Sequence, residues 1–200
     1  MDEPVCIMST GQAVPDSIFS LKDFIELQNS AKDFAISKLD KNNQEEAQRI
    51  KDIENNFEWV RKCAQNSAIA KRHGIIPEDG NRLQDFYEKY DYCPPYTLRA
   101  KYWRQYCPQL AMTAVHKALK EWGGDKNLIT HVVSHSTTGW DVPGLSHHVM
   151  YNLELPTSAR AVPVNFVGCQ GGTSVMFVAS TIAKQDPNAV VLALAAEVWT

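Results

Sequence analysis

The sequence lacks a run of lysine and arginine residues, and its 20 basic and 23 acidic side chains give a net charge of −3. Proteins that bind a nucleic-acid backbone concentrate positive charge, so we expect no nucleic-acid partner. No apolar run approaches the ~18 residues of a membrane-spanning helix, so we expect no membrane span. The first residues, Met1 to Pro4, are acidic where a secretory signal peptide is basic, and we therefore expect a cytoplasmic protein.

Cysteine is sparse as well. The five cysteines are an odd number without CxxC spacing, which indicates neither a disulfide framework nor a zinc site. We expect reduced thiols and no bound metal. The alternative metal site would combine His131 and His135 with the adjacent pair His147 and His148, but no ligand spacing singles these residues out.

The remaining composition, 44% hydrophobic and 22% charged, is that of a globular chain with one sizeable core or two small ones. Near the N-terminus, the apolar run Val5 to Met8 predicts an edge strand. Ser20 followed by Asp23 resembles a capping box and predicts a helix start. A second amphipathic helix is predicted from about Asn43.

The middle of the chain is less regular. Residues 75–95 are rich in Pro, Gly and Asp and predict an irregular connection. A long helix is predicted after Pro108, with a stop at Gly123-Gly124. Residues 129–133 predict a strand and residues 145–153 a short helix.

The last forty residues predict a β-α-β unit: a strand over 161–167, a turn at Gly168-Cys169, a helix from Gly171 to about Ala183 and a strand over 189–195. Both strands are apolar on both faces, which is typical of a parallel sheet covered by helices on its two sides. The predicted fold class is therefore α/β.

Cys169 lies at the turn between the predicted strand and helix, in Val167-Gly168-Cys169-Gln170-Gly171-Gly172. The first turn of a helix has unpaired N–H groups and partial positive charge, which stabilise a thiolate and the oxyanion formed when it attacks a thioester. These features make Cys169 a candidate nucleophile. A cysteine among small residues can equally be packed in a core, and the spacing of the six histidines identifies no partner base.

Several segments together carry a family resemblance. Ser136-Thr137-Thr138-Gly139-Trp140-Asp141-Val142-Pro143-Gly144 is followed 24 residues later by Gly168-Cys169-Gln170-Gly171-Gly172. Residues 66–72 and 110–119 agree in the same order. From about Val5 to its end, the sequence resembles the N-terminal half of type III polyketide synthases, the chalcone/stilbene synthase family of the thiolase superfamily.

The resemblance implies the N-terminal half of a thiolase-like fold, with a mostly parallel mixed sheet covered by helices. It implies that residues 1–200 form one chalcone/stilbene synthase N-terminal-like domain and that the C-terminal domain is absent. Family members are about twice as long, carry a catalytic His and Asn in the second half, and form homodimers. We therefore expect a truncated chain, with little or no activity of its own.

The resemblance also implies an acyltransferase reaction. An acyl-CoA starter would load Cys169, and malonyl-CoA would extend it by decarboxylative condensation, so CoA thioesters are expected as substrates rather than cofactors. Thr137 and Thr138 would line the substrate pocket. Val142 stands where the family often has a methionine that reaches the partner's cavity. The basic residues expected to contact CoA are Arg61, Lys62 and Arg72.

Two other functions remain open. The first is another thiolase-fold condensing enzyme, such as a ketoacyl-ACP synthase III-like protein, which would take malonyl-ACP in place of malonyl-CoA, or a hydroxymethylglutaryl-CoA synthase-like protein. The second is a non-catalytic truncated chain that dimerises with, or regulates, a full-length synthase.

Overall fold

A computed structural model describes residues 4–76 and 82–198. The chain divides into two compact units. The first unit combines the N-terminal segment Met1–Val14 with Tyr96–Thr200, and the second is the continuous segment Pro15–Pro95. Among the described residues, no helix is both long and apolar enough to cross a membrane.

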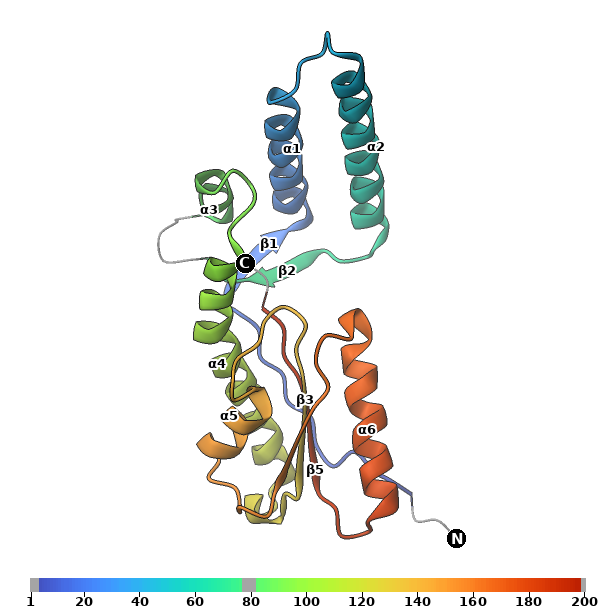
Figure 1. The fold of residues 1–200 in the computed structure, drawn as a ribbon. Coiled ribbons are helices and arrows are strands. Elements are labelled where there is room, and N and C mark those ends of the chain that lie inside the picture. The colour runs from blue at the N-terminus through green and yellow to red at the C-terminus, as the bar shows by residue number, and fades with distance from the viewer. Residues whose placement is uncertain (1–3, 77–81, 199–200) are drawn as a thin grey trace. The chain divides into compact units, whose positions relative to one another are not determined.

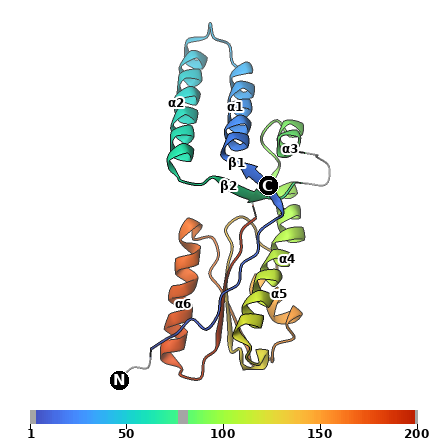
Figure 2. The same cartoon turned by 180° about the vertical axis from the view of Figure 1, so that it is seen from behind.

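The second unit is built on a helical hairpin. Strand β1 (Ser17–Ser20) leads directly into helix α1 (Leu21–Ser37), and helix α2 (Gln44–Asn66) returns to strand β2 (Lys71–Gly74), which pairs antiparallel with β1. Figure 2 shows α1 and α2 side by side above this two-stranded ribbon. A short helix, α3 (Leu83–Lys89), follows within the segment expected to be irregular, so that expectation is wrong there. Residues 77–81 of the same segment lie outside the described residues.

Side-chain caps determine where both long helices begin. The Ser20 hydroxyl accepts a hydrogen bond from the Asp23 N–H, and the Asp23 carboxylate accepts one from the Ser20 N–H, which is the reciprocal capping box. At α2, the Asn43 side chain accepts from the N–H groups of Glu45 and Glu46. Both predicted helix starts are confirmed.

The first unit contains a parallel three-stranded sheet. Strand β3 (His131–His135) lies at its centre, between β4 (Arg160–Pro163) and β5 (Val191–Ala195). Helices α4 (Tyr96–Trp122) and α5 (Leu145–Asn152) lie on one side of the sheet, and α6 (Gly171–Gln185) lies on the other (Figure 1). The predicted α/β class with a helix-covered parallel sheet is confirmed.

Alternation along β3 produces a separate core on each face of the sheet. Val132 packs with Leu194 and with residues of α4 and α5, whereas Val133 packs with Val175 and Ala179 of α6. Val132 and Val133 are completely buried. Successive strand residues point to opposite faces, so a sheet covered on both sides needs apolar residues at consecutive positions.

The N-terminal segment is not a strand. Residues 4–15 have no regular secondary structure, and no strand among the described residues pairs with Val5 to Met8. The segment instead runs along α4, where the Thr10 N–H donates to Glu121 and Lys117 donates to the Gln12 carbonyl. A Cβ on Gly11 would overlap the backbone of α4 at Ala114, so this close approach needs a glycine. The predicted edge strand over Val5 to Met8 is therefore wrong.

Two other predicted boundaries were wrong. Helix α4 begins at Tyr96 rather than after Pro108 and continues through that proline, because its first half already buries Trp103 and Cys107. Strand β4 ends at Pro163, before the predicted 167, and the following residues turn toward the site. The predicted stop at Gly123 is confirmed, and this residue has a φ of +68°.

We expect Ser20→Ala to lower the free energy of unfolding by about 1 kcal/mol, because the first turn of α1 loses its cap. Urea titration followed by circular dichroism measures this change. Lys51→Ala, an exposed position on α2, is the control and should change stability by less than about 0.5 kcal/mol. Equal effects of the two substitutions would show that the cap contributes nothing.

Candidate active site

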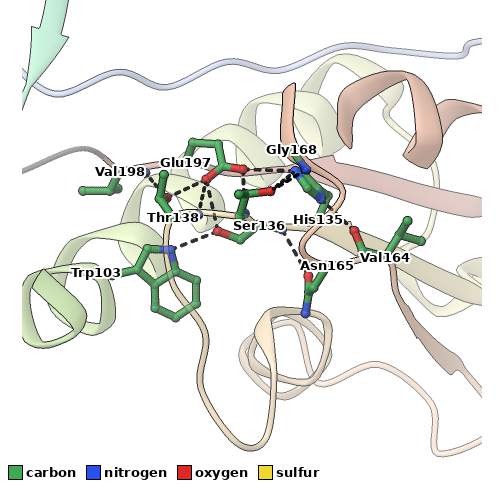
Figure 3. A network of polar contacts seen from close by, with 10 residues as sticks. Trp103, His135, Ser136, Thr138, Val164, Asn165, Gly168, Glu197 and Val198 are labelled. Atoms are coloured by element: carbon green, nitrogen blue, oxygen red, sulfur yellow. Dashed lines mark hydrogen bonds and ion pairs between the residues drawn. The ribbon is translucent and has the colours of Figure 1, made fainter. Parts of the chain in front are cut away.

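Residues that follow the three parallel strands meet at one edge of the sheet. Because the strands are parallel, their carboxyl ends lie at the same edge, where ligand sites of open α/β sheets commonly form. Figure 3 shows this edge, with Ser136 after β3, Asn165 after β4 and Glu197 after β5. The sequence therefore places polar side chains from three separate segments close together.

The Glu197 carboxylate is the central acceptor of this network. The N–H of Thr137 donates to Oε1 at 2.8 Å, and the N–H of Thr138 donates to Oε2 at 2.9 Å. The hydroxyls of Thr138 and Ser136 donate to Oε2 as well. One side chain from the end of β5 thus satisfies the backbone of the loop that follows β3.

His135 lies beneath this loop and is only 2% exposed. Its Nδ1 is 2.7 Å from the Val164 carbonyl, and its Nε2 is 3.0 Å from Glu197 Oε1. Ser136, the next residue, is also buried, and its hydroxyl accepts a hydrogen bond from Trp103 Nε1 at 3.0 Å. The Ser136 N–H donates to Asn165 Oδ1 at 3.1 Å. His135 and Ser136 therefore both have specific partners, which favours one conformation of the loop.

Cys169 lies in a turn, Gly168–Gln170, just before α6, and is exposed. Gly168 has a φ of +67°, a conformation that favours glycine, and its N–H donates to Thr137 Oγ1 at 3.1 Å. No side chain caps the start of α6, and the N–H of its first residue, Gly171, donates to the Gly168 carbonyl. Cys169 is therefore not a packed core cysteine, and its role as a nucleophile stays a prediction.

The predicted substrate-binding residues take different positions. Thr137 and Thr138 belong to the Glu197 network, and Thr137 also contacts the Cys169 turn. Val142 is 79% exposed and follows Asp141, whose carboxylate accepts the Val142 N–H. The structure therefore brings Thr137, Thr138 and the Cys169 turn together, whereas Val142 contributes an exposed side chain.

The predicted CoA-contacting residues belong to the second unit. Arg61 and Lys62 both pair with Glu58 on α2, at 2.7 and 3.6 Å. The Glu58 hydrogen bond raises the pKa of Arg61 and lowers that of Glu58. Arg72 of β2 lies over the Phe24 ring at 4.4 Å, and its Nη1 is buried with no partner among the described residues. Their assignment to CoA stays a prediction.

The histidines do not gather into a metal site. In the described ranges, no group of three or more His, Cys, Asp or Glu side chains could hold a metal ion. His131 Nδ1 lies 2.9 Å from the hydroxyl of Thr130, and both nitrogens of His135 already face protein acceptors.

Sequence reasoning did not single out Glu197 or His135 as site residues. The available signal was a charged residue directly after an apolar strand, in Leu194-Ala195-Ala196-Glu197, and a histidine at the end of another. Their pairing depends on the register of β3 with β5, in which His135 is opposite Ala195. That register could not be derived from local spacing.

Comparison with known proteins places the chain in a family. Residues 3–200 match the family described as chalcone and stilbene synthases, N-terminal domain. The chain is also 31% identical over 159 residues to a protein named probable polyketide synthase 1 from Dictyostelium discoideum, a match that covers 76% of this chain and 5% of that protein. The chain belongs to the chalcone and stilbene synthase family and has its thiolase-like N-terminal fold. The family resemblance predicted from the sequence is confirmed.

Cys107 is completely buried, whereas the other four cysteines are exposed. Its side chain lies inside the first unit, and desolvation, together with the charge of Glu197, raises its pKa to about 12. The folded state therefore keeps a proton that the unfolded chain releases above about pH 9. Stability is predicted to fall as the pH rises from about 9 toward 12.

We expect iodoacetamide at pH 8 to leave Cys107 unmodified in the folded chain while it labels the exposed cysteines. Peptide mapping by mass spectrometry measures the labelling, with a urea-unfolded sample as the positive control. Labelling of Cys107 at the same rate as Cys63 in the folded chain would contradict the prediction. The exposed cysteines are Cys6, Cys63, Cys93 and Cys169.

Proposed function

We propose that this chain supplies the nucleophile-bearing part of a type III polyketide synthase, in which Cys169 accepts an acyl group from CoA. The observation that carries the proposal is the position of Cys169, exposed in a turn that a hydrogen bond from Gly168 to Thr137 holds at the carboxyl edge of the sheet. Membership of the chalcone and stilbene synthase family supports it.

In the proposed loading step, the Cys169 thiolate attacks the carbonyl carbon of an acyl-CoA. A sulfur–carbon bond forms, the bond to the CoA sulfur breaks, and the CoA thiolate leaves and takes up a proton. N–H groups at the start of α6 are suited to stabilise the intermediate oxyanion. Malonyl-CoA would then lose CO₂, and the resulting carbanion would attack the acyl thioester and release Cys169. The family's catalytic His and Asn would assist this second step.

The remaining assignments follow from the same proposal. Thr137 and Thr138 would border the acyl group beside Cys169, because their hydrogen bonds fix the loop next to the turn. Arg61, Lys62 and Arg72 would contact the CoA phosphates, with Arg61 and Lys62 first releasing Glu58. The complete synthase would be a cytoplasmic homodimer. No resident cofactor is needed, since CoA thioesters are the substrates.

We expect Cys169→Ala to abolish covalent loading from an aromatic or long-chain acyl-CoA, because the attacking sulfur is lost. Intact-mass spectrometry of the full chain detects the acyl adduct. Cys63→Ala, which removes another exposed thiol from α2, is the matched control and should load as the unaltered chain does.

The possible outcomes separate the alternatives. An adduct that persists in Cys169→Ala would exclude this cysteine as the nucleophile. Loading from acyl-CoA followed by extension only with malonyl-ACP would favour a ketoacyl-ACP synthase III-like enzyme. No loading in any variant, together with altered activity of a co-purified full-length synthase, would favour a non-catalytic partner.

Val142 offers a test of starter selection. We expect Val142→Met in the complete synthase to reduce kcat/KM for bulky starters about tenfold relative to a small one, since the longer side chain takes up pocket volume. Steady-state kinetics with a series of acyl-CoA starters measures this ratio. Tyr151→Phe, another highly exposed position, is the control, and an unchanged starter preference in Val142→Met would remove this residue from the pocket.

A further inference from the structure

His135 has a hydrogen-bonding environment that defines its charge. The Val164 carbonyl can only accept, so Nδ1 must carry a hydrogen at this 2.7 Å contact. The other nitrogen, Nε2, faces Glu197 Oε1 at 3.0 Å. Two backbone N–H groups and two hydroxyls donate to the Glu197 carboxylate, a set of donors that favours its ionised form. Nε2 must then also carry a hydrogen, which makes His135 an imidazolium; the assignment follows from the hydrogen-bond network.

The imidazole ring also lies directly against the start of α6. A Cβ built on Gly171, the first residue of that helix, would overlap the His135 ring at Nε2 and its neighbouring carbons. At the next position, Gly172, a Cβ would meet nothing within 4 Å. The backbone therefore approaches the ring at Gly171 and is open one residue later.

A second connection reaches the same turn from the other side of Cys169. Thr137 Oγ1 lies 3.3 Å from His135 Nε2 and accepts the Gly168 N–H at 3.1 Å. Gly168 and Gly171 flank the turn that contains Cys169. One of these glycines packs on the His135 ring, and the other is held by a hydroxyl that contacts the same ring nitrogen.

We propose that His135 is a positioning residue for the nucleophile: its imidazolium, paired with Glu197, supports the turn from Gly168 to Gly171 and compensates the carboxylate charge that the Cys169 thiolate would otherwise face. The inference rests on the proposed role of Cys169. Cys107 on α4 lies within the field of Glu197, and Cys169 is linked to the pair through the turn that Thr137 and His135 contact. Because Cys107 keeps its proton, Glu197 is the negative charge that His135 compensates.

The test measures the rate of Cys169 alkylation by iodoacetamide in the full chain at pH 7, with Cys63 of the same molecule as the internal reference. His135→Gln should slow Cys169 roughly tenfold, because an uncompensated carboxylate disfavours the thiolate, and leave Cys63 unchanged. A Cys169 rate within about twofold of the unaltered chain would overturn the proposal, since nearby charges move thiol reactivity by more than this.

A double variant that also removes the Glu197 charge distinguishes charge compensation by His135 from a role in which its ring only fills space. Adding Glu197→Gln to His135→Gln removes the uncompensated charge and should restore most of the lost Cys169 rate. A purely structural role for His135 would predict a double variant at least as slow as the single one, and that result would overturn the proposed charge compensation.

The glycine pair gives a test that leaves both charges in place. Gly171→Ala should slow Cys169 alkylation because the methyl group displaces the turn from the ring, whereas Gly172→Ala should not. Equal rates in the two variants would overturn the proposed contact, and this comparison applies even if His135→Gln fails to fold. Alkylation needs no acyl transfer, so a failed acyl-loading assay with intact Cys169 reactivity would count against the proposed function alone.

Discussion

The ion pair between His135 and Glu197 is the interaction on which the arrangement of the site depends. It joins the end of β3 to the segment after β5 in a region where His135 is almost fully buried. The Glu197 side chain is 33% exposed, so the cost of leaving water falls mainly on His135, whose charge is tolerated in the interior only if its hydrogen-bonding capacity is satisfied. Here the Val164 carbonyl takes the other imidazole N–H, and the N–H groups of the β3 loop take the other carboxylate positions. The pair can therefore exist only if both strand ends are correctly placed.

The network joins buried and exposed residues. Cys169 is accessible, and its turn is bonded to Thr137, an exposed residue that in turn contacts the buried His135. Functional residues are commonly carried on loops that a rigid scaffold positions. In this chain the scaffold extends past the regular strands, because the backbone N–H groups of the loop after β3 donate to the side chains of Glu197 and Asn165.

Local features of the sequence were enough to predict most elements and the turn that contains Cys169. Ser20 with Asp23, Asn43 and Gly123 mark helix ends through contacts within a few residues, so they could be recognised without the fold. Cys169 was found because its position between a strand and a helix is itself local.

The features that were missed depend on distant partners. Val5 to Met8 looks like a strand, but a strand needs a neighbour, and no strand among the described residues pairs with it; the contacts with α4 are made further on, by Thr10 and Gln12. Pro108 was taken as a helix start because proline disfavours helix interiors, whereas burial of Trp103 and Cys107 extends α4 through it. Glu197 contacts residues about 60 positions earlier, a separation at which periodicity carries no information.

The first unit is discontinuous in sequence. Its N-terminal segment attaches to α4 through Thr10 and Gln12, and roughly 80 residues of the second unit are inserted between its two parts. Closing a flexible loop of that length costs about 4 kcal/mol in chain entropy, and contacts of such high sequence separation slow folding. The attachment of Thr10 and Gln12 to α4 is therefore expected to form late in folding.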